Sequence, residues 1–306
     1  MLFKSDNGKK VRIILTFLLL IAWTGCSRNT NQSVTKESGE TGNKAINRII
    51  SAAPSITEII AGLGLAGKLI ATDKYSRDLE EVRKDLPEID FFYPDIEAIT
   101  GLKPDIIIMS EINTNGSANT PYEFLQSLGI SVIEIPTSNS IAEIYRDILT
   151  IAEALGVTEK GEAMVREMKE QIEKTAADVA GNNVNNGTNG KITVYFEITP
   201  APNMVSFGRG TYLNELIEII GAENIFAAEN RWFAPGPEAI ISANPGLIFI
   251  LNDVSDITEI KNRPGFRNLD AVKHNKIFII DANHASRPSQ NIVLTLEEMY
   301  RAVYIH

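Results

Sequence analysis

Cysteine and histidine are scarce in this chain. Its 306 residues include one cysteine, Cys26, and three histidines, His274, His284 and His306, which lie far apart in the sequence. One cysteine cannot form an intramolecular disulfide. Zinc and manganese sites normally combine several histidines with carboxylates at close spacing, so we expect no resident metal and no other cofactor. His284 could lie in a loop over a ligand, but a solvated loop position is the simpler interpretation.

Catalytic motifs are absent as well. The sequence contains no Gly-x-Ser-x-Gly, no Walker loop and no Gly-x-Gly-x-x-Gly that follows a predicted strand. Positive charge is in the minority, because 29 Lys and Arg face 39 Asp and Glu and give a net charge of −10. No basic tract follows the first twelve residues. We therefore expect that the protein is not an enzyme, does not bind nucleic acid and does not adhere to anionic lipid through its surface.

Only one long apolar run occurs near the start of the chain, from Ile13 to Trp23, after four basic residues. A membrane span needs about 20 apolar residues, so this run fits the core of a signal peptide better. Gly25 and Cys26 follow it and resemble a bacterial lipobox, although Trp23 stands where leucine is usual. We expect residues 1–25 to be a lipoprotein signal peptide and Cys26 to carry the lipid. The alternative is an uncleaved anchor with an incidental cysteine.

Residues 26–46 are rich in Ser, Thr, Asn, Gly and Lys and contain few apolar side chains. Such a segment cannot bury a core and is typical of a flexible tether. With a lipid at Cys26, the tether would hold a folded domain outside the cytoplasm, anchored to a bacterial membrane in the periplasm or at the cell surface.

One segment of the sequence occurs twice. Residues 97–109 read EAITGLKPDIIIM, and residues 238–250 read EAIISANPGLIFI. Each copy has the pattern of a short helix that begins with Glu, a turn at Pro and a buried strand. Two copies in one chain predict two α/β lobes with mainly parallel sheets.

The periodicity of the apolar residues divides the rest of the chain. We predict an N-terminal lobe over 47–157, an interlobe helix over 158–181 and a C-terminal lobe over 191–306. Met164, Met168, Ile172 and Val179 recur at helical spacing as far as Gly181. A helix of that length would be a rod of roughly 33 Å that joins the lobes rigidly; alternatively, it is an ordinary surface helix of one lobe.

Ligands of two-lobed proteins bind where the lobes meet, and open α/β sheets bind ligands at the carboxyl ends of their strands. The loops at these positions carry aromatic and polar side chains, namely Ser55, Tyr75, Phe91, Phe92, Glu111, Trp232, Phe233 and Arg287. Such a set suits a large, flat or polycyclic ligand held by stacking and hydrogen bonds. Each aromatic alone could equally anchor its loop in the core. Aromatic residues precede both repeats, which favours binding.

Glu97 and Glu238 begin the two repeated segments. A carboxylate in the first turn of a helix is favoured by the helix dipole, which explains either residue alone. Two equivalent carboxylates could also pair with Arg residues on a two-fold symmetric partner.

Several motifs together resemble one protein family. They are RIISAAPSITEIIAGLGL, the first repeat, LGISVIEIP, FGRGTYLNELIEIIGAENIF, the second repeat and ASRPS before the last predicted helix. The combination runs from Arg48 to the C-terminus and resembles the class III, helical-backbone substrate-binding proteins of ABC importers for cobalamin and iron complexes.

The resemblance implies a ligand cleft between two lobes, a long rigid helix that joins them, and docking of Glu97 and Glu238 onto the Arg residues of a permease dimer that works with an ATPase. Tyr75, Phe91 and Trp232 align with aromatics of cobalamin-binding members, which also have an Arg near Arg287. The implied role is to capture a metal chelate as a monomer and to deliver it to the permease.

Two departures from the family pattern leave the ligand open between cobalamin, a ferric siderophore and haem. Ser110 stands where some members have Trp, and a loop rich in Gly and Asn is inserted at 181–190. The rival interpretation is an extracytoplasmic lipoprotein enzyme or adhesin with an α/β fold. That interpretation leaves the duplicated Glu unexplained.

Overall fold

A computed structural model describes residues 45–113, 121–186, 191–253 and 256–305. Cys26 and the predicted signal peptide therefore lie outside the described residues. Within the described ranges, no helix is both long enough and apolar enough to span a membrane.

The first lobe is built on a parallel four-stranded sheet with the order β2-β1-β3-β4. The strands are β1 (Ile49–Ser51), β2 (Leu69–Ala71), β3 (Ile106–Ser110) and β4 (Ser131–Ile135). The helices are α1 (Pro54–Gly62), α2 (Ile96–Gly101), α3 (Pro121–Ser127) and α4 (Ile141–Ala154). β3 lies between two neighbours, and its first four residues are buried, as expected for a strand covered on both faces.

The second lobe has its own parallel sheet with the order β10-β9-β5-β7. The strands are β5 (Thr193–Glu197), β7 (Glu223–Asn224), β9 (Leu247–Leu251) and β10 (Ile277–Ile280). A small antiparallel pair joins β6 (Ser206–Phe207) to β8 (Trp232–Phe233). The helices are α6 (Tyr212–Ile219), α7 (Pro237–Ala243), α8 (Ile257–Asn262), α9 (Asp270–Lys273), α10 (Ala282–Ser286) and α11 (Ile292–Tyr304).

The two sheets share one topology, which extends the repeat seen in the sequence. Among the strands of each main sheet, counted in chain order, the first and third are central and the second and fourth are at the edges. The repeated segments form α2–β3 in one lobe and α7–β9 in the other. In both, the residue before the proline has a left-handed backbone, with φ of 49° at Lys103 and 45° at Asn244. The prediction of two α/β lobes with parallel sheets is confirmed.

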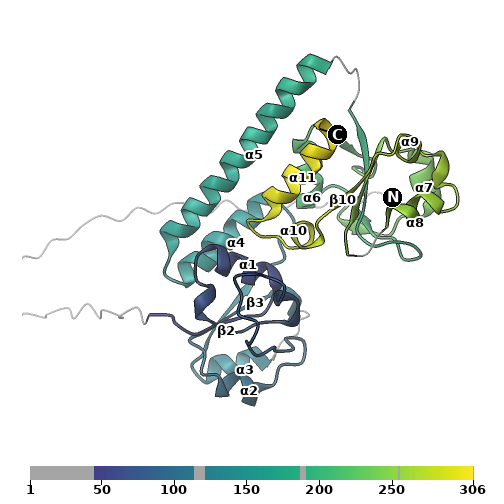
Figure 1. Cartoon of the computed structure of the whole chain (residues 1–306). Helices are drawn as coiled ribbons and strands as arrows, with labels where there is room; N and C mark the ends of the chain where they lie inside the picture. The colour runs from purple at the N-terminus through teal and green to yellow at the C-terminus, as the bar shows by residue number, and fades with distance from the viewer. Residues whose placement is uncertain (1–44, 114–120, 187–190, 254–255, 306) are drawn as a thin grey trace, which may run out of the picture. The chain divides into compact units, whose positions relative to one another are not determined.

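The long helix α5 (Thr158–Asn186) runs beside both lobes in Figure 1. It packs on α4 of the first lobe and on α11 and α6 of the second. One buried apolar cluster includes Ile49 of β1, Met168 of α5 and Phe249 of β9, so a continuous core connects the lobes through this helix. Burial of shared apolar surface on both sides resists bending of the connection.

Helix α5 extends beyond the end that the sequence predicts. Gly181 was expected to stop the helix, but helical structure continues to Asn186. A tertiary contact stabilises this last part, because Asn182 Nδ2 donates a hydrogen bond to the Tyr300 hydroxyl of α11 at 2.9 Å. Intrinsic propensity is a weak guide where such contacts form.

Residues Ser55 to Glu58 (SITE) have the sequence pattern of a capping box, but this pattern does not cap helix α1. Helix α1 begins two residues earlier, with Ala53 as the N-cap and Pro54 in the first turn, and no side chain caps it. Proline is favoured at the first helical position because its missing N–H would be unpaired there anyway. Glu58 is thereby released from capping and turns towards the second lobe.

Candidate functional site

A cavity of about 270 Å³ is lined by residues of both lobes. From the first lobe come residues that directly follow β1, β3 and β4, including Ser55, Ile112 and Ser138. From the second lobe come Tyr212, Trp232 and Arg287. The cavity thus lies at the carboxyl ends of parallel strands, where open α/β sheets bind ligands.

A second cavity of about 530 Å³ adjoins the first, since both are lined by Ala53, Pro54 and Ile112. It extends along the loop after β2 and is lined by Tyr75, Phe91 and Phe92. We call the two adjoining cavities the cleft. Their combined lining is apolar and aromatic with a few polar groups, which is the usual composition of a small-molecule site.

Trp232 presents an aromatic surface to the cleft from the second lobe. Its ring packs edge-on against the buried Phe207, with 5.6 Å between the ring centroids, while 42% of the residue stays exposed. Its neighbour Phe233 points the other way, as successive strand residues do. Phe233 packs perpendicular to Phe226 at 5.0 Å in the core of the second lobe. Of Trp232 and Phe233, only Trp232 is among the residues that line the cleft.

The aromatic residues of the first lobe divide in a similar way. Tyr75 and Phe92 are 61% and 52% exposed and border the cleft. Phe91 also lines it, but the residue is 3% exposed and belongs to the core beneath. Glu111 lies between Ser110 and Ile112 in sequence but is not itself among the residues that line the cleft, and its carboxylate accepts a hydrogen bond from the backbone N–H of Thr137 at 3.3 Å. A ligand would therefore meet Tyr75 and Phe92 more readily than Phe91.

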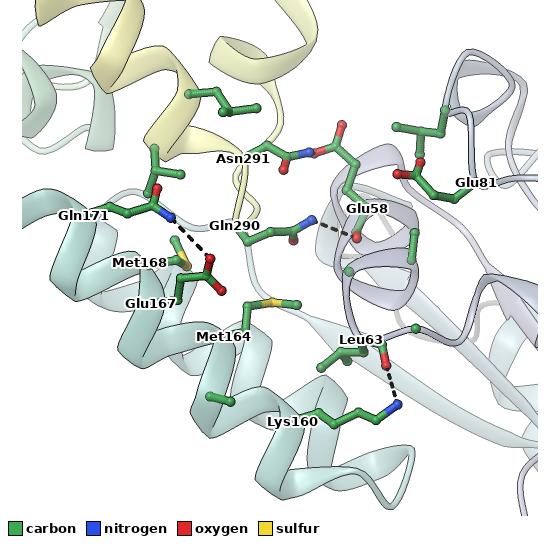
Figure 2. Close-up of a pocket in the computed structure, with 17 residues that line it drawn as sticks. Glu58, Leu63, Glu81, Lys160, Met164, Glu167, Met168, Gln171, Gln290 and Asn291 are labelled. Carbon is green, nitrogen blue, oxygen red and sulfur yellow. Dashed lines mark hydrogen bonds between the residues drawn. The ribbon is translucent and has the colours of Figure 1, made fainter.

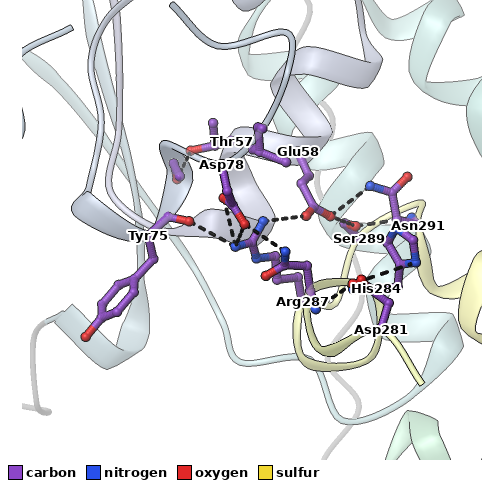
Figure 3. A network of polar contacts seen from close by, with 12 residues as sticks. Thr57, Glu58, Tyr75, Asp78, Asp281, His284, Arg287, Ser289 and Asn291 are labelled. Atoms are coloured by element: carbon purple, nitrogen blue, oxygen red, sulfur yellow. Dashed lines mark hydrogen bonds and ion pairs between the residues drawn. The ribbon is translucent and has the colours of Figure 1, made fainter. Parts of the chain in front are cut away.

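Arg287 belongs to a polar network that joins the lobes, shown in Figure 3. Its Nη1 donates to Glu58 Oε1 at 3.0 Å, and its Nη2 donates to Asp78 Oδ2 at 3.0 Å and to the Tyr75 carbonyl at 2.9 Å. The side chains of Arg287 and Glu58 are 10% and 1% exposed. Glu58 also accepts hydrogen bonds from Ser289 and Asn291 of the second lobe.

Burial raises the pKa of Glu58, and the hydrogen bonds from Ser289 and Arg287 oppose that rise. The network therefore compensates a buried carboxylate with a buried guanidinium. Arg287 borders the cleft, but its charge is balanced by Glu58 and Asp78 before any ligand arrives.

Sequence reasoning missed Ser138 and Asp147, which line the cleft beside Trp232. Ser138 comes three residues after the end of β4, so the same rule that selected the other loops could have found it. Asp147 lies on α4, one residue before the buried Ile148 and three after the buried Ile144. An acidic residue beside an apolar stripe was the available signal. Ser138 Oγ donates a hydrogen bond to Asp147 Oδ2.

His284 is also placed differently from the solvated loop that the sequence favoured. It lies in α10 and is partly buried, and its Nδ1 is 3.2 Å from Glu298 Oε1. This hydrogen bond raises the pKa of His284, against the effect of burial. Figure 3 shows His284 beside the network of Arg287 and Glu58.

Glu97 and Glu238 occupy matching positions at the second residue of α2 and α7. Both residues are exposed. Within the described part of the chain, neither carboxylate has an ion-pair partner. The helices that carry them are anchored by Ile99 and Ile240, which are fully buried in the cores of their lobes. Each carboxylate is therefore held on a fixed element and remains open to a partner.

A larger cavity of about 680 Å³ lies on the α5 side of the junction between the lobes, shown in Figure 2. Met164 and Gln171 of α5, Gly62 of α1 and Gln290 line it. Gln290 Nε2 donates to the Glu58 carbonyl at 3.0 Å. This cavity is not at the carboxyl ends of the strands. The cleft is therefore the better candidate for the functional site, although each of its two cavities is smaller than this one.

Comparison with known proteins gives a consistent result. A family model described as periplasmic binding protein matches residues 49–284. An uncharacterised ABC transporter substrate-binding lipoprotein of Bacillus subtilis is 27% identical over 90% of this chain and 83% of its own length. A vitamin B12-binding protein of Vibrio parahaemolyticus is 24% identical over 85% of this chain and 92% of its own.

The fold is also found among solved structures. A possible iron-binding, periplasmic solute-binding protein of Staphylococcus epidermidis superposes with a TM-score of 0.74 and 27% identity, over 85% of this chain and all of that chain. These relatives are binding components of transport systems and not enzymes.

Proposed function

Because the chain belongs to the periplasmic binding protein family, we propose that it is the substrate-binding component of an ABC transporter, as the Bacillus subtilis relative is named, and that it captures a metal chelate in the cleft between its lobes. Cobalamin, a ferric siderophore and haem are the candidate ligands. Relatives named for vitamin B12 and for iron support this class.

One observation carries the proposal: exposed aromatic residues from both lobes border one continuous cleft. Trp232 contributes from the second lobe, and Tyr75 and Phe92 contribute from the first. Stacking between flat rings and a flat or polycyclic ligand is worth roughly 0.5–1.5 kcal/mol per pair beyond the buried area. A chelate with a conjugated ring system is the ligand that such side chains fit.

We also propose that a lipid at Cys26 anchors the protein to a bacterial membrane on its extracytoplasmic side. The basic start, the short apolar run and Gly25-Cys26 support this, as does a relative that is itself a lipoprotein. Acyl labelling that persists in Cys26→Ala would contradict it.

The visible spectrum tests the ligand class directly. The purified protein is incubated with cobalamin, haem or a ferric siderophore and then passed through a desalting column. We expect the absorbance of one chelate to elute with the protein at a defined stoichiometry. Retention of none of them would contradict the proposal.

A further inference from the structure

The side chains that line the cleft are mostly acidic where they are charged. Of the described residues that line it, only Lys74 and Arg287 are cationic. Four are carboxylates, namely Asp73, Glu88, Asp90 and Asp147. Carboxylates thus outnumber cations four to two along the cleft, and the whole chain also has a formal net charge of −10.

Neither cation is available to a ligand without losing an existing contact. Arg287 is compensated by Glu58 and Asp78. Lys74 Nζ lies 4.7 Å from the centre of the Tyr75 ring, a cation–π arrangement. A carboxylate of an incoming ligand would therefore find no unpaired guanidinium among the residues that line the cleft.

Three of the four carboxylates already have hydrogen-bond or ion-pair partners near the loop after β2. Asp73 accepts hydrogen bonds from the Tyr75 N–H and Ser76, Glu88 pairs with Arg77, and Asp90 accepts from the N–H groups of Phe92 and Tyr93. Asp147 differs from them in position, because it is the one carboxylate among the described residues that line the smaller cavity with Trp232. Ser138 occupies its Oδ2, and Oδ1 has no hydrogen-bond partner among the described residues.

We propose that Asp147 is a specificity-determining residue of the cleft, which accepts a hydrogen bond from an N–H group at the edge of the ligand and selects against chelates with anionic groups there. The inference rests on the proposed function and narrows its ligand class. The preferred ligand is a neutral or cationic chelate with amide or ammonium donors along its rim. Chelates that present carboxylates or catecholates are disfavoured.

The physical reason is that the carboxylate of Asp147 attracts a hydrogen-bond donor of the ligand and repels an anionic group. A hydrogen bond to a carboxylate in a partly buried site favours a donor by about tenfold in affinity or more. An anionic group at the same place meets like charge, and Arg287, the one cation among the described residues that line this cavity, is already paired with Glu58 and Asp78. Ser138 fixes the carboxylate, so Asp147 cannot easily turn away from an unfavourable ligand.

Equilibrium dialysis of the purified protein against four chelates at pH 7.5 tests the inference. Cyanocobalamin and ferrioxamine B present amide or ammonium donors, whereas haem and ferric enterobactin are anionic. We expect the protein to bind a donor-bearing chelate at least about tenfold more tightly than either anionic one. Asp147→Asn should reduce this ratio about tenfold. The control Asp178→Asn makes the same charge change on an exposed part of α5 and should leave the ratio unchanged.

A second variant separates charge from geometry. Ser138→Ala keeps the negative charge but removes the hydrogen bond that orients it, so anionic chelates should remain excluded while the donor-bearing chelate binds less tightly. Anionic chelates that bind as tightly as the others, or a ratio that moves equally in Asp147→Asn and Asp178→Asn, would overturn the inference while the proposed function stands. Binding of no chelate by any of these proteins would overturn the proposed function itself.

Discussion

At the scale of single residues, Trp232 is the exposed aromatic side chain that the second lobe contributes to the cleft. One edge of its ring rests on Phe207, and the exposed remainder faces the cleft. Trp232→Ala should weaken chelate binding about tenfold, because a stacking partner and its buried area are lost. Trp232→Phe should restore most of the affinity. The comparison is made by dialysis, and an affinity for Trp232→Ala that equals that of the parent would place the ligand elsewhere.

The raised pKa of Asp147 leads us to expect a measurable effect of pH on the free energy of unfolding. Burial, reinforced by Glu143, raises the pKa of Asp147 from 3.8 to about 6, against the effects of Ser138 and Arg146. The folded state then binds more protons than the unfolded state between these two values, so this group makes stability fall as pH rises from about 4 to about 6. The contribution is constant at higher pH.

Asp147→Asn should therefore be more stable than the parent above pH 7, and the two should converge near pH 4. Urea unfolding at several pH values measures the difference directly. A difference in unfolding free energy that is the same at pH 4 and pH 7.5 would show that the carboxyl does not titrate with a raised pKa.

Some residues could be identified from sequence and others could not, for physical reasons. Trp232, Tyr75 and Ser55 followed from the rule that strand ends bind ligands, and the structure places all three at the cleft. The network of Arg287 with Glu58 depends on two segments more than 200 residues apart, as the separation of 229 shows. No local pattern predicts such a contact. The local pattern from Ser55 to Glu58 is that of a capping box, which points to a different role for Glu58 than the contact with Arg287.

At the scale of helices and strands, the polar network between α1 and the segment before α11 joins the two lobes through hydrogen bonds and an ion pair. Glu58→Ala would leave the buried Arg287 with Asp78 as its remaining carboxylate partner. Removing one partner of a buried pair usually costs about 3–5 kcal/mol. Asp78→Ala serves as the control, because the Asp78 side chain is 45% exposed and should contribute about 1 kcal/mol or less.

Urea denaturation compares these two variants. We expect Glu58→Ala to lower the unfolding free energy several times more than Asp78→Ala does. Equal, small losses would mean that water replaces the contacts of Glu58 and that the network does not fix the lobes.

The paired helices α2 and α7 lead to a prediction about transport. Glu97 and Glu238 are exposed at equivalent positions of two lobes with the same topology, which suits ion pairs with a two-fold symmetric permease. An exposed pair contributes roughly 0.2–1 kcal/mol, so either single Ala substitution should be mild. The double variant Glu97→Ala/Glu238→Ala should impair uptake of the chelate and leave its affinity unchanged.

Uptake by cells and affinity of the purified protein must both be measured for this double variant. If affinity fell as much as uptake, these residues would belong to the binding site or the fold. If uptake stayed normal, the carboxylates would serve only to begin their helices.

The elements themselves were largely predictable. Both repeats appeared as a helix, a proline turn and a strand, because apolar residues with clear periodicity dominate them. The end of α5 was not predictable, since it depends on a hydrogen bond from Asn182 to Tyr300 of α11, which is distant in the sequence. Propensity yields to tertiary contacts at such positions.

At the scale of the whole molecule, two lobes of one topology share a core along α5 and leave a cleft at the ends of their strands. The central claim is that this cleft, and not the cavity near Met164 and Gln290, binds the chelate. The anomalous scattering of the metal in a crystal of the protein with its chelate locates the ligand without ambiguity. We predict one strong metal peak between Trp232 and Tyr75. A peak in the cavity lined by Met164 and Gln290, or on the outer surface, would contradict the account.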